Sequence, residues 1–476
     1  MSKSLANGFF WSAIDRFAVV VVQILIEIVL ARLLLPADYG LIGMVAVFIA
    51  IAQVFTDGGF LNALIQKQDR SETDYGTVFL TGLVLGLVLY VILYFTAPLI
   101  AAFYHVDILT MLVRVLGLNI IFNSLTTVFR AKLTVEMNFR RQALFSLISI
   151  SVSGVLGYWL ALRGTGVWAL VAQLVSFYGF NTLFLLLGTG WFPVLKFSKT
   201  SFQSLFGFGS RLLLASLVQA IYMNLYNLLI GKIFRQSELG IYQKSTQFTL
   251  YPAGMLTNMI QRVMFPFLSG FQDDDAKLSE LNKQYYTVVA MIFFPLFFGL
   301  SMLAEPFVRI FLTDTWIAAV PVIRILSIAF LFYPLININM YVFQIKGLSG
   351  RFLSIEVLTK ISGIIILIVT LQYDMVVVSV GILVQQVIHL LVSAYYADKL
   401  LKKRPFAQFG LLLPLFVFSI VISLLNNYVM EMISDVWLKF FSGFLIILVS
   451  YGFYYLVFNK DEMKMLVGVF RKKGSV

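Results

Sequence analysis

Long apolar runs alternate with short polar connections along almost the whole chain. A transmembrane helix needs about 20 mostly apolar residues, and about fourteen runs reach this length. The runs cover residues 10–32, 40–62, 77–103, 108–129, 142–162, 166–189, 205–231, 239–262, 285–309, 317–344, 352–371, 376–397, 407–428 and 437–458. We therefore predict an all-α polytopic membrane protein with about 14 transmembrane helices, in which any function is carried out within the bilayer region.

Positive charge is divided unequally between the two sets of connections. One set carries most of the Lys and Arg residues, including the cluster over residues 399–404 and the tail Arg471-Lys472-Lys473. The other set carries few: Arg32, Arg163, Lys232, Arg235, Arg309 and Lys439. Because Lys and Arg accumulate in cytoplasmic loops, we predict that both termini are cytoplasmic, and an even number of spans agrees with this.

Composition excludes several classes of protein. Hydrophobic residues make up 60% of the chain and charged residues 12%, against about half and a quarter in soluble proteins. Cytoplasmic cations explain the net charge of +12, so we expect no nucleic-acid partner. The chain has no cysteine and only two histidines, and it has no phosphate-binding glycine loop or nucleophile motif. We therefore expect no enzyme, no cofactor and no metal site.

A twelve-residue segment is repeated 200 residues later. Residues 31–42 match residues 231–242 without a gap. The aligned pairs are Arg32 with Lys232, Asp38 with Glu238, and Gly40 with Gly240. In both copies an apolar helix ends in a cation, and an acid then opens the next helix, where its charge meets the positive end of the helix dipole.

Two further arginine pairs extend the repeat: Arg114 with Arg324, and Arg141 with Arg351. We predict an N-terminal lobe of six spans over residues 1–200 and a C-terminal lobe of six spans over residues 201–400. Residues 401–476 would hold two peripheral spans and a basic cytoplasmic tail. Parallel repeats of this kind place a central site between them.

Polar side chains inside the spans mark this predicted site, because buried polarity in a membrane is by default functional. In the first span, Arg16, Gln23 and Glu27 are spaced by seven and four residues and share one helix face. The other polar positions that we assign to a hydrated cavity are Asp57, Asn119, Asn123, Asn224, Asn227, Gln243 and Gln247, with Lys244 beside the last two.

Several of these positions have a purely structural alternative. Arg16 could lie among the lipid headgroups, and Arg114 and Arg324 could snorkel to the outer surface. Asp57 could cap a helix or mark a hinge.

Two other charged groups are interpreted as structural. Glu356 and Lys360 are spaced by four residues in the order that favours an ion pair on a helix surface, which indicates mutual neutralisation. The acidic run Asp273-Asp274-Asp275 is interpreted as part of a solvated cytoplasmic loop.

The N-terminal part of the chain resembles a known family. Gly8-Phe9-Phe10-Trp11-Ser12 is followed by LARLLLPADYG at 30–40, FTDGGF at 55–60 and ALIQK at 63–67. Together these segments look like the polysaccharide-transporter branch (O-antigen and colanic-acid-type lipopolysaccharide flippases) of the MOP exporter superfamily. The resemblance is strongest over residues 8–80, and the layout of fourteen spans extends it over the whole chain.

The resemblance implies a flippase of a bacterial inner (plasma) membrane that moves undecaprenyl-diphosphate-linked oligosaccharides by alternating access. It implies coupling to an ion gradient or membrane potential. Its expected partners are the lipid-linked oligosaccharide, membrane lipids and other polysaccharide-assembly proteins. A diphosphate in a low-dielectric slab needs paired cations, and sugars need amide and aromatic partners. The cavity cations would be Arg16, Arg114, Lys244, Arg324 and Lys360, with Arg16 and Lys244 acting in the inward-facing state and Arg114 and Arg324 near the exit.

Other functions remain as alternatives. An ion-coupled multidrug and organic-cation antiporter of the same superfamily would need a cavity dominated by acids, whereas Glu27 and Asp57 are outnumbered by cations here. A lipid II flippase is a closer relative that the N-terminal motif supports less. A glycan polymerase or ligase would need a large exoplasmic loop, which the span pattern leaves no room for.

Overall fold

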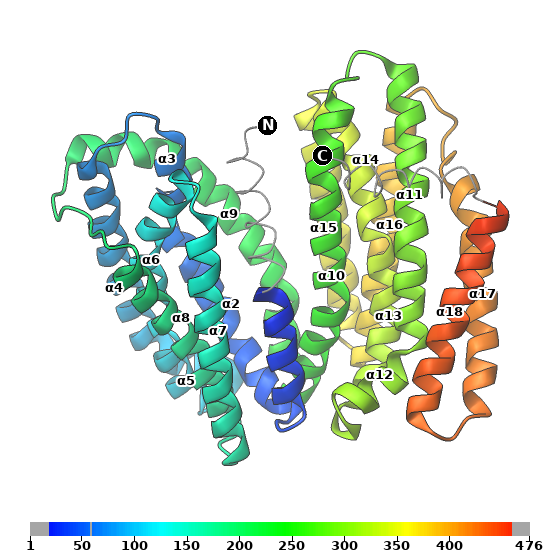
Figure 1. Ribbon diagram of the computed structural model, residues 1–476, viewed down its shortest axis with the longest axis horizontal. Helices are drawn as coiled ribbons and strands as arrows, with labels where there is room; N and C mark the ends of the chain where they lie inside the picture. The colour runs from blue at the N-terminus through cyan, green and yellow to red at the C-terminus, as the bar shows by residue number, and fades with distance from the viewer. Residues whose placement is uncertain (1–18, 58–59, 459–476) are drawn as a thin grey trace. The chain divides into compact units, whose positions relative to one another are not determined.

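The computed structural model describes residues 19–57 and 60–458. Every regular element among these residues is a helix, and no strand occurs among them (Figure 1). The chain divides into two compact units, Met1–Gly240 and Ile241–Val476. The all-α membrane fold predicted from the sequence is confirmed.

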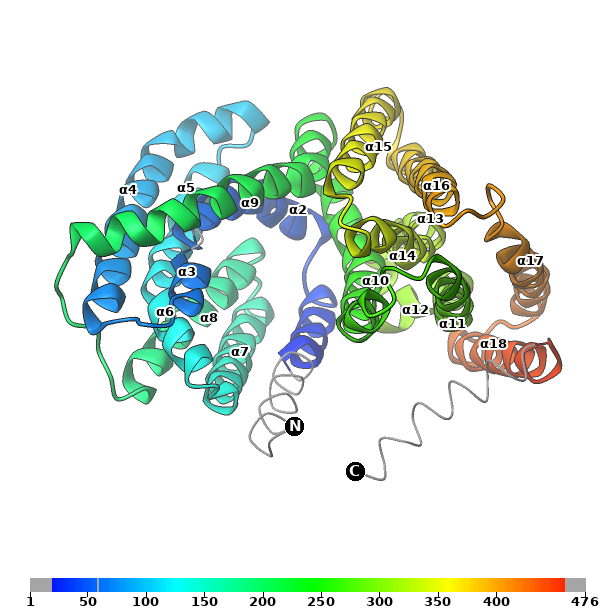
Figure 2. The same cartoon turned by 90° about the horizontal axis from the view of Figure 1, so that it is seen from above.

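The first unit contains a short helix over Val19–Ala31 and then α2 to α9. The bounds are α2 (Pro36–Asp57), α3 (Phe60–Gln66), α4 (Glu72–Tyr104), α5 (Leu109–Leu116), α6 (Leu118–Val135), α7 (Phe139–Leu162), α8 (Val167–Gly188) and α9 (Lys199–Ile233). Figure 2 shows α9 running across this unit, where it packs against α2, α3 and α4. The next helix, α10 (Gln236–Ser269), begins in the first unit and continues into the second.

The second unit continues with α11 to α18. The bounds are α11 (Asp275–Met302), α12 (Ala304–Phe311), the 3₁₀ turn η1 (Asp314–Trp316), α13 (Ala319–Leu331), α14 (Tyr333–Ile345), α15 (Ser349–Thr370), α16 (Met375–Leu400), α17 (Phe409–Glu431) and α18 (Val436–Phe458). Helix α16 packs against α13, α14 and α15. Helices α17 and α18 lie at the edge of this unit, against α11 and α12 (Figure 2).

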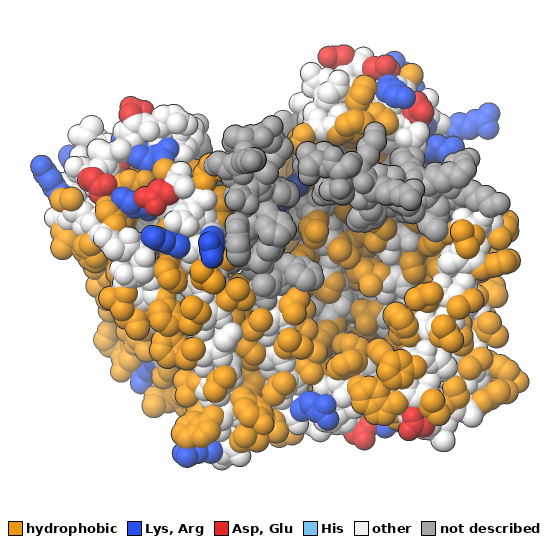
Figure 3. Space-filling view, in the orientation of Figure 1, with side chains coloured by type: hydrophobic (Ala, Val, Ile, Leu, Met, Phe, Trp, Pro, Cys, Tyr) orange, Lys and Arg blue, Asp and Glu red, His pale blue; other side chains and the backbone are white. Residues whose placement is uncertain are grey.

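Eleven helices of the described residues are long and apolar enough to cross a membrane. Hydrophobic side chains cover the middle of each unit and charged side chains gather toward its two ends, as the visible face in Figure 3 shows. Helices α9 and α10 have 35 and 34 residues, which is long enough, but their sequences are more polar. The count of fourteen therefore stays a prediction.

Two of these eleven spans, Leu109–Val135 and Ala319–Ile345, are each interrupted at one residue within the span. The span expected over residues 317–344 is split into α13 and α14 next to Pro334, which occupies the first turn of α14. A proline lacks the amide proton that a continuous helix would need, so it marks a new helix start. The span over residues 108–129 is likewise split at Gly117, between α5 and α6. Apolar content alone does not reveal either break.

The repeated acidic residues perform the same task in both copies. The backbone N–H of Leu35 donates to Asp38 Oδ2 at 2.9 Å, and that of Arg235 donates to Glu238 Oε2 at 3.2 Å. Both acids lie in the first turn of their helices, α2 and α10. An acid that reaches back to the residue before a helix satisfies one of its free amide groups. The predicted role of the acids is thus confirmed.

The second repeated region also has one local structure. Met137 and Gly347 both have a left-handed backbone, with φ of 54° and 70°. The next amide donates back five residues in each copy, from Asn138 to the Leu133 carbonyl and from Leu348 to the Phe343 carbonyl, both at 2.8 Å. These bonds close the C-termini of α6 and α14 in the Schellman manner, just before α7 and α15 begin.

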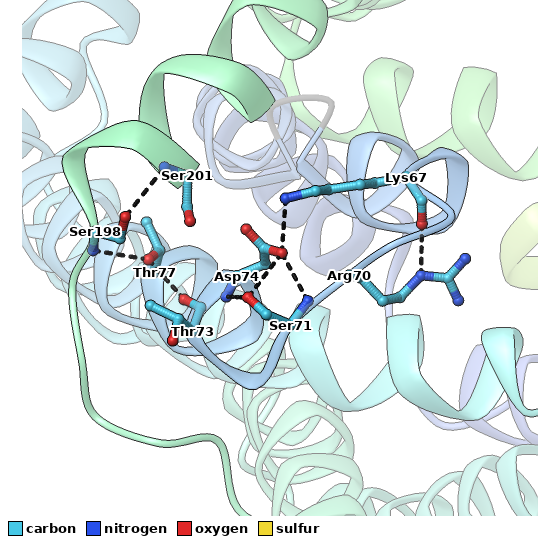
Figure 4. A network of polar contacts seen from close by, with 8 residues as sticks. All are labelled: Lys67, Arg70, Ser71, Thr73, Asp74, Thr77, Ser198 and Ser201. Atoms are coloured by element: carbon cyan, nitrogen blue, oxygen red, sulfur yellow. Dashed lines mark hydrogen bonds and ion pairs between the residues drawn. The ribbon is translucent and has the colours of Figure 1, made fainter.

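A polar network fixes the start of α4 against α9 at the predicted cytoplasmic end of the first unit (Figure 4). Asp74 is almost fully buried and accepts from Lys67 Nζ at 2.8 Å and from the Ser71 amide at 2.7 Å. The Ser198 amide donates to Thr77 Oγ1 at 3.0 Å, so the residue that caps α9 is tied to α4. The connection before α9 is therefore a packed part of this unit.

The acidic run in the second unit is also more ordered than expected. Asp274 caps α11, and Asp275 accepts from Lys346 Nζ at 2.5 Å and from Lys402 Nζ at 2.8 Å. These lysines belong to the connections after α14 and α16. The run is exposed to solvent, as expected, and Asp275 in addition joins three connections through its two lysine partners.

Candidate functional site

Among the predicted cavity cations that the structure describes, Lys244 on α10 is the most deeply buried. Only 1% of the Lys244 side chain is exposed, and its Nζ donates to Gln247 Oε1 at 3.0 Å. Gln243 lies on the same helix and is half-buried. A buried ammonium must be compensated by polar partners, and Gln247 provides one of them. The three side chains that the sequence grouped together thus lie on one segment of α10.

Arg114 lies on α5 and is held by an aromatic side chain of α4. Its guanidinium carbon is 4.3 Å from the centroid of the Tyr94 ring, and its Nε donates to the Tyr94 carbonyl at 3.4 Å. A cation above an aromatic face is attracted by the ring quadrupole. Arg114 is therefore positioned by both the ring and the backbone of one residue.

Arg324, the repeat counterpart of Arg114, is held by a carboxylate instead. Its Nη2 is 3.8 Å from Glu305 Oε2 on α12. Glu305 also pairs with Arg309 at 3.2 Å, and Arg309 pairs with Asp314 at 2.5 Å. The two repeated arginines thus share a sequence position and have different partners.

A cavity of about 270 Å³ lies beside this chain of ion pairs in the second unit. Its lining comes from α12, from the connection before α18 and from the start of α18: Glu305, Pro306, Arg309, Ser434, Val436 and Lys439. The unequal distribution of Lys and Arg between the two sets of connections predicts that the cavity lies at the exoplasmic end of the second unit. Both signs of charge line the cavity.

Lys360 forms the ion pair that its spacing predicts. Its Nζ lies 3.4 Å from Glu356 Oε2, one turn earlier on α15. His389 on α16 adds a third ionisable group, with its Nε2 at 3.9 Å from Glu356 Oε1. The ion pair is confirmed, and His389 is an ionisable neighbour that was not among the predicted cavity residues.

The four predicted asparagines lie on two helices, α6 and α9. Asn119 and Asn123 are buried one turn apart on α6. Asn224 on α9 is half-buried and donates from Nδ2 to the Ala220 carbonyl at 2.9 Å, and Asn227 lies nearly one turn further on. All four are oriented by helices, which gives them defined positions from which to contact a polar ligand.

Four of the predicted residues belong to the N-terminal part of the chain. Gln23 is exposed and Glu27 is half-buried on the helix over Val19–Ala31. Arg16 and the side chain of Asp57 lie outside the described residues. Their roles stay predictions.

The structure groups some site residues and leaves others apart. Lys244 contacts Gln247, and the two buried amides of α6 are neighbours, whereas Arg324 and Lys360 contact acids in separate parts of the second unit. Sequence reasoning missed Glu305, the partner of Arg324; the acid beside Pro306 at the start of α12 was the available signal. The assembly of all these residues around one cavity stays a prediction.

Among the residues that the structure describes, no three His, Asp or Glu side chains form a group that could hold a metal ion. The residues predicted for the site carry ammonium, guanidinium, amide and carboxylate groups. Such groups bind phosphates and sugars through charge-assisted and neutral hydrogen bonds.

Comparison with protein families identifies the chain. The model of a family described as polysaccharide biosynthesis protein matches residues 29–321, more than half of the 476 residues. The chain belongs to this polysaccharide biosynthesis protein family. The match includes the whole of the first repeated segment and reaches into α13.

Three curated relatives align with about two thirds to three quarters of this chain. The chain is 25% identical to the teichuronic acid biosynthesis protein TuaB of Bacillus subtilis over 73% of this chain and 72% of that protein. It is 26% identical to the lipopolysaccharide biosynthesis protein WzxC of Escherichia coli over 69% of this chain and 67% of that one. It is 24% identical to the succinoglycan biosynthesis transport protein ExoT of Rhizobium meliloti over 69% and 66%.

Solved structures show the same fold. The lipid II flippase MurJ, in an inward closed conformation, superposes with a TM-score of 0.73 over 95% of this chain and 99% of that one, at 16% identity. An inward-facing multidrug resistance MATE transporter of the MOP superfamily gives 0.62 over 82% and 98%, at 15% identity. At these identities the likeness concerns the fold alone.

Proposed function

We propose that this protein translocates an undecaprenyl-diphosphate-linked oligosaccharide, the repeat unit of an O-antigen, capsule or exopolysaccharide, from the cytoplasmic to the outer leaflet of a bacterial inner membrane. The observation that carries this proposal is the family match over residues 29–321 of a chain built almost entirely of membrane helices. Surface glycans are assembled from precursors that must cross the membrane, and such a chain contributes by transport. The relative ExoT is itself named as a transport protein.

Cations inside the membrane region support a diphosphate as part of the cargo. Lys244 on α10 carries a buried ammonium group, and its Nζ lies 3.0 Å from the amide oxygen of Gln247. Taking a diphosphate into a low-dielectric region requires such cations and hydrogen-bond donors. In the proposal, Arg16 and Lys244 bind the diphosphate in the inward-facing state, Arg114 and Arg324 bind it near the exit, and Lys360 contributes from α15.

Alternating access between residues 1–200 and 201–400 would expose these groups to each side in turn. The remaining polar residues would contact the sugars: Gln23, Glu27, Asp57, Asn119, Asn123, Asn224, Asn227, Gln243 and Gln247. Residues 401–476 would lie outside this movement, with both termini in the cytoplasm. Movement of an intact lipid-linked glycan forms and breaks no covalent bond, so the protein would not be an enzyme.

A multidrug antiporter and a lipid II flippase are the alternatives within the same fold. The structural likeness to MATE and MurJ concerns the fold and does not choose between them. Sequence similarity favours the polysaccharide assignment, since the family and the three relatives all concern polysaccharides. The preponderance of cations over acids in the spans also disfavours organic cations as cargo.

The proposal is tested by deleting the gene in the native bacterium and analysing extracted undecaprenyl-diphosphate lipids by mass spectrometry. We expect accumulation of a lipid-linked oligosaccharide and loss of a surface glycan, both restored by the intact gene. Unchanged lipids and surface glycan, with new sensitivity to organic cations, would instead indicate the antiporter. Accumulated lipid II with a weakened cell wall would indicate a peptidoglycan role.

A further inference from the structure

Three ionisable side chains meet between α15 and α16, far from the ends of both helices. Glu356 is the eighth residue of α15 and His389 the fifteenth of α16. At a rise of about 1.5 Å per residue, they lie about 10 Å and about 21 Å from the helix starts. Both helices are long and apolar enough to cross a membrane. The group therefore lies inside the hydrocarbon region, where charge is by default functional.

The carboxylate of Glu356 lies between two bases. Its Oε2 is 3.4 Å from Lys360 Nζ, and its Oε1 is 3.9 Å from His389 Nε2. The exposed fractions of the side chains are 23% for Glu356, 30% for Lys360 and 14% for His389. Each carboxylate oxygen thus faces a different base. The three side chains are largely buried, and each keeps part of its surface exposed.

Neutralisation explains only two of these three residues. Glu356 and Lys360 together carry no net charge, so a pair of them needs no further partner. His389 is an additional titratable group, and its buried Nε2 has no hydrogen-bond partner among the described residues. Histidine is the side chain whose charge changes most readily near neutral pH. Proton binding would turn Nε2 into a donor that faces a carboxylate, which can only accept.

The surroundings contribute few other charges. The charges that act on His389 come from Glu356 and Lys360, both on α15. From α14, the phenol of Tyr333 lies within electrostatic range of Glu356. From α13, Arg324 is paired with Glu305 on α12. The protonation of His389 therefore depends first on its burial and then on one acid and one lysine, Glu356 and Lys360.

We propose that the Glu356–His389 pair is a proton site that couples a transmembrane proton gradient to the transport cycle, with Lys360 holding the carboxylate in place. This inference rests on the proposed function, because it names the coupling ion of that transport. A proton from the exoplasmic side binds Nε2 of neutral His389 and gives an imidazolium opposite Glu356. The group then changes from zero to one net positive charge. Release of the same proton to the cytoplasm restores the neutral imidazole and completes the cycle.

The test uses the full chain in proteoliposomes that enclose a pH-sensitive dye. The vesicles contain lipid extract from the deletion strain, and matched vesicles contain extract from the parent strain. We expect proton movement that depends on the deletion-strain extract and falls at least about ten-fold in His389→Asn and in Glu356→Gln. His105→Asn removes the other histidine of the chain and is expected to keep the rate within about two-fold.

Two outcomes would overturn the proton site while leaving the flippase intact: glycan-lipid translocation without proton movement, or proton movement retained in both site variants. Failure of the flippase itself is distinguishable, because the deletion strain would then accumulate no lipid-linked oligosaccharide.

A second measurement tests the proposal without the site variants, in case these fail to fold. With two histidines in the chain, labelled histidine gives two imidazole NMR signals, and His105→Asn assigns them. We expect the His389 signal of the otherwise intact protein to change with pH in the range of about 5 to 8. A signal that keeps one protonation state throughout this range would overturn the proposal.

Discussion

Gly40 on α2 packs against the first residue of α10, and Gly240 on α10 packs against the first residue of α2. A Cβ added to Gly40 would lie 1.8 Å from the carbonyl oxygen of Gln236, and one added to Gly240 would lie 1.8 Å from that of Pro36. Pro36 and Gln236 are the first residues of α2 and α10. The two copies of the repeat therefore pack on each other reciprocally, and this contact explains why both retain a glycine two residues after the acid.

Gly240→Ala is expected to destabilise the protein because the added methyl group must displace backbone. Overpacking of this kind costs about 1–3 kcal/mol, and we expect a lower Tm for the purified protein in detergent. Gly254 lies on the same helix, and a Cβ there would meet no atom within 4 Å. Gly254→Ala is the control and should leave Tm equal or slightly higher, since alanine favours helix by about 1 kcal/mol. Equal Tm values for Gly240→Ala and the unmodified protein would contradict the reciprocal contact.

Asp275→Asn should loosen the predicted cytoplasmic end of the second unit. Asp275 accepts from both Lys346 and Lys402, and an amide would leave two ammonium groups without their shared anion. Because the carboxylate is exposed to solvent, which screens its ion pairs, we expect a small effect, read as faster proteolysis of the connection between α10 and α11. Asp273→Asn changes the same charge in the same acidic run and should have no effect. Similar proteolysis rates for the two variants would argue against the network.

Asp74→Asn should loosen the start of α4. The Asp74 carboxylate is buried and holds Lys67 and Ser71 through bonds of 2.7–3.0 Å. Loss of a buried charged acceptor costs about 1–3 kcal/mol, so we expect faster amide hydrogen exchange at the start of α4. Asp69→Asn alters an exposed acid of the same connection and is the control. Unchanged exchange in Asp74→Asn would show that apolar packing alone fixes the start of α4.

Lys244→Gln should reduce export of the surface glycan by at least about ten-fold, because the substitution removes a buried cation proposed to bind the diphosphate. The amount of accumulated lipid-linked oligosaccharide in the complemented deletion strain measures the effect, with the protein level determined in parallel. Lys199→Gln removes an exposed lysine and should export normally. Normal export by a well-expressed Lys244→Gln protein would remove Lys244 from the proposed site.

Much of the fold could be predicted from local sequence. The length of each apolar run indicated the membrane helices, and the helix-capping role of Asp38 and Glu238 followed from their position after a repeated cation. The divisions at Gly117 and beside Pro334 were missed because both interrupt apolar runs without changing their hydropathy. The candidate site was harder to predict from the sequence. Arg324 could be named because it is repeated, but its partner Glu305 lies on another helix.

The sequence by itself determined the class of protein, the helix starts in the repeat and the Glu356–Lys360 ion pair, because each depends on residues within a few positions of one another. Only the tertiary structure decided that Gly40 and Gly240 meet opposite backbones, that Asp275 joins three connections, and that His389 faces Glu356. These contacts unite residues far apart in the chain, and helix packing, which hydropathy does not encode, brings them within bonding distance.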